Sequence, residues 1–177
     1  MTIELGVARG IDAQAFGQPG QRTFKLRVLG SSSESVSLWI EKEHLSALGM
    51  AIRQLLAQLK YEEEPRATDL GQFPKLVEQE FQISLMAIGF NPPERTLVIQ
   101  VSELGVGEDD EPTLRVQLTL EHCASLAVQI DDIVARGRPV CPLCGLSINP
   151  SGHSCIRSNG HSEQPIPESR QEENPDD

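Results

Sequence analysis

The chain has 177 residues, a formal net charge of −11 and a hydrophobic content of 38%. A body of about 140 residues buries roughly two-thirds of its unfolded surface, which is enough to fold without a staple. No apolar run approaches the ~20 residues of a membrane-spanning helix, and no cluster of Lys and Arg marks a nucleic-acid surface. We therefore expect no membrane insertion, and the acidic charge counts against nucleic acid as a partner.

The N-terminal residues MTIELGVARGIDAQ alternate apolar and polar side chains. They lack the basic stretch followed by an apolar run that marks a signal peptide. The sequence therefore predicts a cytoplasmic protein whose thiols stay reduced. In that compartment a local cluster of cysteines is more often a metal site than a set of disulfides.

Three strands and a helix are expected in the first part of the chain. Alternating apolar residues predict strands at 3–7, 22–28 and 36–40, and FGQPGQR predicts a type II turn before the second of them. This turn lacks the lysine and the following helix of a phosphate-binding loop. The helix is indicated by apolar residues at helical spacing, namely Leu45, Leu48, Ile52, Leu55 and Leu56.

The second part of the chain repeats the first. VSLWIEKEHLSALGMAIRQLL, from Val36, aligns without a gap with LRVQLTLEHCASLAVQIDDIV, from Leu114. Upstream, RTFKLRV from Arg22 matches RTLVIQV from Arg95 in residue type, and an alternating stretch precedes each of them. The unit is therefore strand, strand, strand, helix, used twice.

Short connections between successive strands, such as LGSSSES and ELGVGEDDEP, favour antiparallel pairing over parallel crossovers. We expect an α+β fold with an antiparallel sheet of about six strands, built from two βββα repeats, and two helices on one face. The repeat halves cover about 1–60 and 79–137 within a domain of residues 1–137. The acidic tail 162–177 has almost no apolar residues and is expected to be disordered.

Residues 138–161 hold three of the four cysteines and form the predicted zinc-binding hook. Cys141 and Cys144 have the C-x-x-C spacing that directs two thiolates to one ion, and Cys155 is the obvious third ligand. His153 or His161 would complete a tetrahedron, and His153 is favoured because it lies beside Cys155 in a short glycine-containing turn. Such a set leaves no open position, so we expect a structural zinc ion, with iron as the minor choice.

Two other interpretations of these thiols remain. A thioredoxin-type redox pair would place C-x-x-C at the start of a helix, whereas here Gly145 and two prolines surround a loop. The cysteines could also be structural thiols that lie together by chance. The spacing favours a metal over both.

Three separated motifs resemble family 3090 of the domains of unknown function. They are GQPGQRTF near the start, LWIEKEHLSALG in the middle and RPVCPLCGLSINPSGHSCIRSNG near the end. The resemblance covers nearly everything from Ile3 to Gly160 and implies metal ligands at Cys141, Cys144, His153 and Cys155. His161 stands where the family usually has an aromatic residue, which supports treating it as a non-ligand. No activity follows, because the family has none assigned.

Other residues that could carry chemistry are few. Adjacent His122 and Cys123 cannot face each other on a helix, and Cys123 takes the core position that Leu45 has in the first repeat. His44 and His122 are repeat-equivalent and are expected to be exposed at the starts of the helices. Possible contacts to an anion are the arginines Arg22, Arg95 and Arg157.

The sequence favours a non-catalytic binding or adaptor module with a structural zinc site and a protein partner. An alternative is an enzyme or ligand-binding domain for a phosphorylated metabolite, with its pocket between the repeats. A second alternative is a nucleic-acid-binding zinc-ribbon protein, which the acidic charge disfavours. No acid pair or serine triad indicates catalysis.

Overall fold

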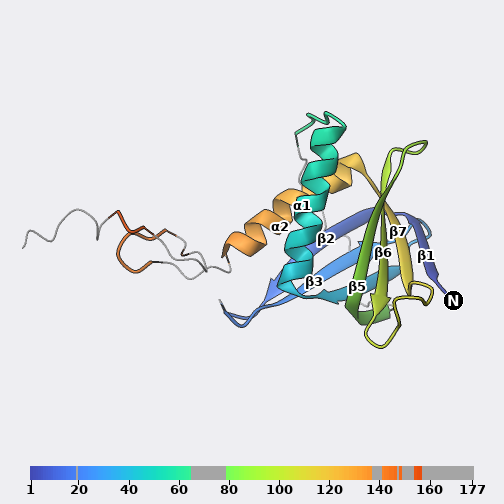
Figure 1. Cartoon of the computed structure of the whole chain (residues 1–177), viewed down its shortest axis with the longest axis horizontal. Helices are drawn as coiled ribbons and strands as arrows, with labels where there is room; N and C mark the ends of the chain where they lie inside the picture. Colours follow the sequence, from blue (N-terminus) through green and yellow to red (C-terminus); the bar gives the residue numbers. More distant parts are fainter. Residues whose placement is uncertain (19, 65–78, 137–140, 147, 149–153, 157–177) are drawn as a thin grey trace, which may run out of the picture. The chain divides into compact units, whose positions relative to one another are not determined.

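The computed structural model describes residues 1–18, 20–64, 79–136, 141–146, 148 and 154–156. The chain divides into two compact units, residues 1–138 (the first unit) and residues 139–177 (the second unit). Every described helix and strand lies in the first unit (Figure 1). The cysteine cluster lies in the second unit.

The first unit contains seven strands and two helices. The strands are β1 (Ile3–Val7), β2 (Gly10–Phe16), β3 (Thr23–Leu29), β4 (Ser35–Ile40), β5 (Gln79–Asn91), β6 (Thr96–Glu103) and β7 (Leu114–Thr119). The helices are α1 (Lys42–Gln58) and α2 (Leu120–Arg136). Among the described helices, none combines the length and the hydropathy needed to cross a membrane.

The α+β class is confirmed, and the sheet has the order β1-β7-β6-β5-β4-β3-β2. Strands joined by hairpins pair antiparallel, as expected, but β1 pairs with β7 and β4 pairs with β5 in parallel. The sheet is therefore mixed and has seven strands, not the antiparallel six that the turn pattern favoured. The reason is that α1 and a long connection separate β4 from β5, and such a crossover lets the chain return in the same direction.

The additional strand is β2, which pairs antiparallel with β3 from Gly10 opposite Leu29 to Phe16 opposite Thr23. Its sequence, GIDAQAF, places the small residues Ala13 and Ala15 at positions where other strands have large or β-branched residues. Alanine has a low strand propensity, so the alternation is weak and sequence analysis missed this strand.

The two repeats keep their equivalence in three dimensions. The first residues of β5 pair in parallel with β4, beginning with Gln79 opposite Val36, and its later residues pair antiparallel with β6. In the same way β1 pairs in parallel with β7, beginning with Ile3 opposite Leu114, and β2 pairs antiparallel with β3. Since Val36 and Leu114 are repeat-equivalent, β1 and β2 together correspond to the single long strand β5.

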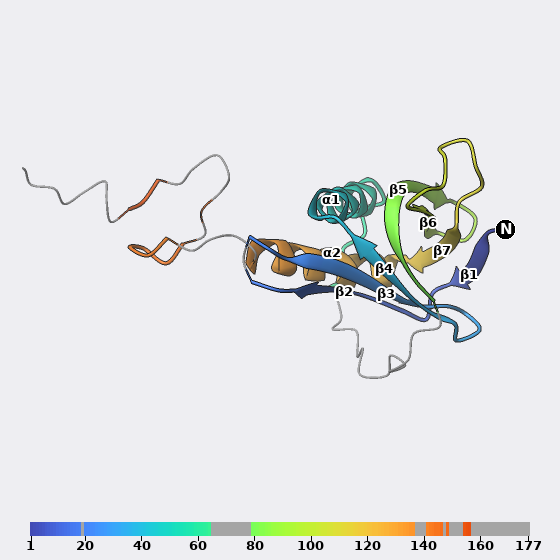
Figure 2. The same cartoon turned by 90° about the horizontal axis from the view of Figure 1, so that it is seen from below.

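The residues between β1 and β2 join the two edges of the sheet. The amide of Ala8 donates to the carbonyl of Gln117 at 2.8 Å, and the amide of Arg9 donates to the carbonyl of Leu29 at 2.9 Å. Two consecutive residues therefore bridge β7 and β3, and the sheet curls until its edges meet at one end (Figure 2).

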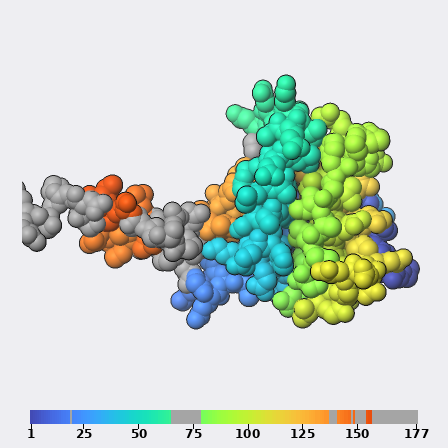
Figure 3. Space-filling model, in the orientation of Figure 1, coloured from blue at the N-terminus to red at the C-terminus, as the bar shows by residue number. Residues whose placement is uncertain are grey.

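Both helices pack on the inner face of the curled sheet. Their buried residues belong to the same core as the inward-facing residues of the strands, and α1 lies alongside β5 (Figure 3). The largest fully buried side chains include Leu26, Val28, Leu45, Leu48, Ile52, Leu97, Leu114, Leu118, Leu126 and Ile130. The repeat-equivalent pairs Leu48 and Leu126, and Ile52 and Ile130, thus fill one common core.

The described residues of the turn between β2 and β3 agree with the predicted type II turn. The amide of Gln21 donates to the carbonyl of Gln18 at 3.0 Å. Gly20 has a φ of 90°, which a type II turn requires at its third position. The glycine-rich segment is therefore a hairpin turn.

Candidate metal centre

The segment 141–146 forms a tight turn around its two cysteines. The amide of Cys141 donates to the carbonyl of Leu146 at 2.8 Å, and the amide of Gly145 donates to the carbonyl of Cys141 at 2.9 Å. Gly145 has a φ of 74°, a left-handed conformation in which a side chain is strained. These two hydrogen bonds fold the backbone back on itself, so that Cys141 and Cys144 lie close together.

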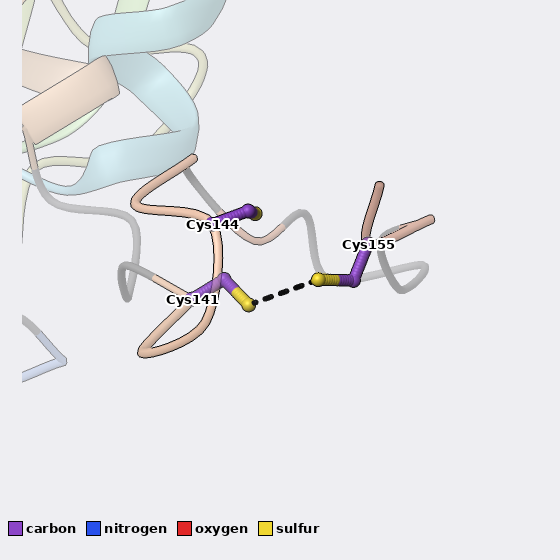
Figure 4. Close-up of side chains that lie close together, drawn as sticks. All are labelled: Cys141, Cys144 and Cys155. Atoms are coloured by element: carbon purple, nitrogen blue, oxygen red, sulfur yellow. Dashed lines mark hydrogen bonds between the residues drawn. The ribbon is translucent and has the colours of Figure 1, made fainter. Parts of the chain in front are cut away.

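Cys155 completes a cluster of three thiols (Figure 4). The three sulfur atoms all lie within 4.8 Å of one another, and the sulfur atoms of Cys141 and Cys155 are 3.8 Å apart. Cys141 is 6% exposed and Cys155 is 7% exposed, while Cys144 is half-buried. The three side chains point into the same space from two separate segments.

The spacing of the sulfur atoms fits a metal ion and not a disulfide. Zn–S bonds of about 2.3 Å in a tetrahedron place two sulfur atoms about 3.8 Å apart, whereas a disulfide requires about 2.05 Å. No disulfide joins any of the four cysteines, all of which lie within the described residues. Three clustered cysteines of this kind could bind a metal ion, and thiolates favour zinc or iron.

The pKa of the Cys144 thiol is raised within the cluster. The backbone N–H of Leu146 lowers this pKa, but partial desolvation and the neighbouring thiols of Cys141 and Cys155 outweigh that effect, so the pKa is raised. Three thiolates repel one another without a cation between them. A divalent ion removes the repulsion and displaces the thiol protons when it binds.

The fourth predicted ligand, His153, lies outside the described residues, and so does its alternative His161. Arg157 and the tail 162–177 lie outside them as well. Of the four predicted ligands, the structure therefore brings together the three cysteines.

Residues 6–155 match the family model described as "Protein of unknown function (DUF3090)". The chain belongs to this family. The matched region ends at Cys155 and so includes all three clustered thiols. No curated protein and no solved structure matches the chain.

The fourth cysteine of this DUF3090 chain, Cys123, lies in the core. It is fully buried on α2, and burial raises the pKa of its thiol to about 12. Such a thiol stays protonated at neutral pH and is a poor nucleophile. The prediction that Cys123 is a small core residue is confirmed.

The repeat-equivalent histidines differ from expectation. His44 and His122 are half-buried rather than exposed, and the Nδ1 atom of each is buried without a hydrogen-bond partner. Desolvation lowers the pKa of His122, and the charge of Glu121 opposes this only in part. Both residues belong to the first turn of a helix that packs against the sheet, which explains the burial.

Two of the three arginines that were predicted to contact an anion, Arg22 and Arg95, lie within the described residues, and their surroundings differ. Arg95 is exposed in the turn between β5 and β6, with a φ of 53°. Arg22 directly precedes β3 and is half-buried, and it lines several hollows of the first unit. The β2–β3 and β5–β6 turns are thus equivalent in the repeat but not in their environment.

Proposed function

We propose that this DUF3090 chain is a non-catalytic binding module whose second unit is folded by a structural Zn²⁺ ion. The ligands are Cys141, Cys144, Cys155 and His153. The observation that carries the proposal is the convergence of three thiols, two of them buried, within 4.8 Å of one another, with the Cys141 and Cys155 sulfur atoms 3.8 Å apart. The expectation from sequence supplies the fourth ligand.

A closed site of three thiolates and one imidazole has no position for water or substrate, so the ion would hold the backbone in place. Binding energies of about 10–16 kcal/mol for structural zinc in small peptides exceed what a segment with few aliphatic residues gains from a core of its own. The role of the metal would therefore be to stabilise the second unit.

The segments that carry the thiols also expose apolar side chains. Leu143 is 55% exposed, Leu146 is 52% exposed and Ile156 is 73% exposed. Each is within two residues of a clustered cysteine, so the metal would fix the backbone from which it projects. Rigid, exposed aliphatic residues are typical of a surface that another protein covers. We therefore propose that the binding partner is another protein.

Metal analysis and hydrogen exchange test the structural role. The purified protein should contain about one zinc ion per chain. Treatment with a chelator should remove amide protection from residues 141–146 and 154–156 and leave β3, β6 and β7 protected. Loss of protection throughout the first unit would contradict a metal that stabilises only the second unit.

Two histidine variants distinguish the fourth ligand. His153→Ala should weaken zinc retention against a competing chelator by at least about tenfold, because an open position exposes the ion to water. His161→Ala is the matched control and should retain zinc as the unchanged protein does. The opposite result would move the fourth ligand to His161.

A double variant tests the contact surface. Leu143→Ser with Ile156→Ser leaves every proposed ligand in place and should keep the zinc content unchanged. A protein partner captured by the unchanged chain should be lost with this variant. Retention of the same partner would show that these side chains are not its contact.

A further inference from the structure

Arg22 lines three adjoining hollows in the first unit. Their volumes are about 170, 250 and 390 Å³. Two of them lie beside the first turn of α1 and are called the α1-side hollows. The third and largest lies between β2 and the last turn of α2 and is called the α2-side hollow. Hollows of this size accept a small ligand or one group of a larger one.

The guanidinium group of Arg22 lacks a carboxylate partner among the described residues. Its Nε atom is buried without a hydrogen-bond partner, and one terminal nitrogen donates to the main-chain carbonyl of Ile133 at 3.4 Å. By contrast, the half-buried Arg27 pairs with Asp12 through two hydrogen bonds. A partly buried cation without a counter-ion is costly, so the donors of Arg22 that have no partner are suited to an anion.

The charges around the hollows decide where an anion would bind. The α1-side hollows are lined by Glu41, and one of them also by Glu43, so they repel a second negative group. Among the described residues that line the α2-side hollow are two arginines, Arg22 and Arg136, and no acidic residue. Arg136 pairs with Asp132 at 3.2 Å, but both side chains are exposed and water screens such a pair.

The remaining polar groups of the α2-side hollow are also suited to a ligand. Gln14 lines it together with Ala13, Ala15 and Phe16 of β2, and β2 is an edge strand. The amide of Ala13 points away from β3 and already donates to the side chain of Gln129. An anion at Arg22 would find a further polar partner on the same wall in the side chain of Gln14.

We infer that the α2-side hollow binds a carboxylate or phosphate group through the guanidinium of Arg22, with Arg136 as the second cation. The site belongs to the first unit and uses none of the proposed zinc ligands. A negative result for anion binding would therefore leave the zinc proposal unaffected, and the reverse also holds.

The chain carries its own reporter for this site. Trp39 is the only tryptophan, and it lines one of the α1-side hollows together with Arg22. Its ring also contacts that of Phe16, with centroids 5.9 Å apart, and Phe16 lines the α2-side hollow. Movement of Arg22 onto an anion should therefore change the fluorescence of Trp39.

The test is a titration of the full-length protein with inorganic phosphate and, separately, with acetate. Sodium chloride keeps the ionic strength constant, and fluorescence and thermal unfolding are the two signals. We expect a saturable change with at least one anion, together with a rise of the unfolding midpoint. The tighter anion identifies the ligand as a phosphate or as a carboxylate.

Four variants assign the response. Arg22→Gln should weaken binding by at least about tenfold, and Arg22→Lys should also weaken it, because lysine keeps the charge but not the planar pair of donors. Arg136→Gln should weaken it by a smaller factor. Arg95→Gln is the matched control, since Arg95 has the equivalent place before β6, and it should bind as the unchanged protein does.

Two results would overturn the inference. One is the absence of a saturable response to either anion in the unchanged protein, which needs no variant to interpret. The other is equal binding by the unchanged protein and by Arg22→Gln or Arg22→Lys. Circular dichroism of each variant confirms that it is folded before its binding is compared.

Discussion

Arg53 on α1 and Asp131 on α2 occupy the same place in the two copies of the repeat and form an ion pair with each other. Equivalent positions of the two copies therefore meet where α1 packs against α2. Both side chains are about half exposed, so the pair adds little stability. Its importance is that it marks where the duplicated halves meet.

Gly49 allows α1 and α2 to approach each other closely. A methyl group added to Gly49 would lie 3.0 Å from Cγ2 of Ile130, a fully buried and β-branched side chain. Gly49→Ala should therefore lower the free energy of unfolding by about 1 kcal/mol, because overpacking outweighs the gain in helix propensity. Urea unfolding at neutral pH measures the change.

The equivalent residue in the second repeat is Ala127, which is buried and already carries this methyl group. Ala127→Gly therefore provides the matched control and should destabilise through lost helix propensity and lost packing, by about 1 kcal/mol. A gain of stability in Gly49→Ala would mean that the helices are less closely packed than the structure shows.

Asp12 is 3% exposed on β2 and pairs with Arg27 on β3 through two hydrogen bonds. The pair raises the pKa of Arg27, chiefly through the hydrogen bond to Asp12. Asp12→Ala should lower the free energy of unfolding by about 2 kcal/mol or more, because it leaves a half-buried guanidinium group without its carboxylate. Thermal and urea unfolding both report this loss.

The exposed pair of Glu4 and Arg115 offers the comparison, with a distance of 2.9 Å. Glu4→Ala should change the free energy of unfolding by less than about 0.5 kcal/mol, since water screens this pair. Equal losses in the two variants would show that burial of Asp12 does not decide the strength of its pair.

The four cysteines should react in two distinct steps. The metal-bound protein should react slowly with a thiol reagent, because three thiols would be held by zinc and Cys123 is fully buried. A chelator should release about three thiols per chain, and a denaturant should release the fourth. Rapid reaction of three thiols without a chelator, in protein that contains zinc, would contradict the proposed ligands.

His122 should make the first unit sensitive to mild acid. Desolvation lowers its pKa in the folded protein below the value of about 6.5 in the unfolded chain. The stability that this difference provides is complete above about pH 6.5 and is lost as the pH falls toward the folded-state pKa. His122→Gln should therefore lose less stability than the unchanged protein between pH 7.5 and about pH 5.5.

Two measurements check this expectation. Urea unfolding at both pH values gives the loss of stability for each protein. An NMR titration of the His122 imidazole gives its pKa directly, and a value above about 6.5 would reverse the expected sign.

Much of the fold could be predicted from local patterns. Apolar residues alternate through β4, at Val36, Leu38 and Ile40, and follow helical spacing in α1, at Leu45, Leu48 and Ile52. This change of spacing indicates a strand that leads into a helix, and the structure contains both. The turn at Gly20 depends on its local backbone conformation. Such features follow from neighbouring residues, which explains why a single sequence was sufficient to predict them.

The cysteine cluster could be anticipated for the same reason. The turn around Cys141 and Cys144 is short, and its closure depends on Gly145, which the sequence shows directly. Cys155 lies only fourteen residues from Cys141, so a compact segment can bring both thiols to one ion. The sequence gives a weaker signal for the α2-side hollow, because nothing in it distinguishes Arg22 from its repeat equivalent Arg95.

The sequence by itself determined the duplication, the hairpins, the helices with their buried faces, and the three thiols that can share an ion. Only the tertiary structure decided that β4 pairs with β5 and β1 with β7 in parallel, and that Ala8 and Arg9 close the sheet. It also decided that Arg22 is half-buried without a carboxylate partner among the described residues while Arg95 is exposed. The physical reason is that periodicity and turn residues act over a few positions, whereas strand order and burial depend on contacts between residues far apart in the chain.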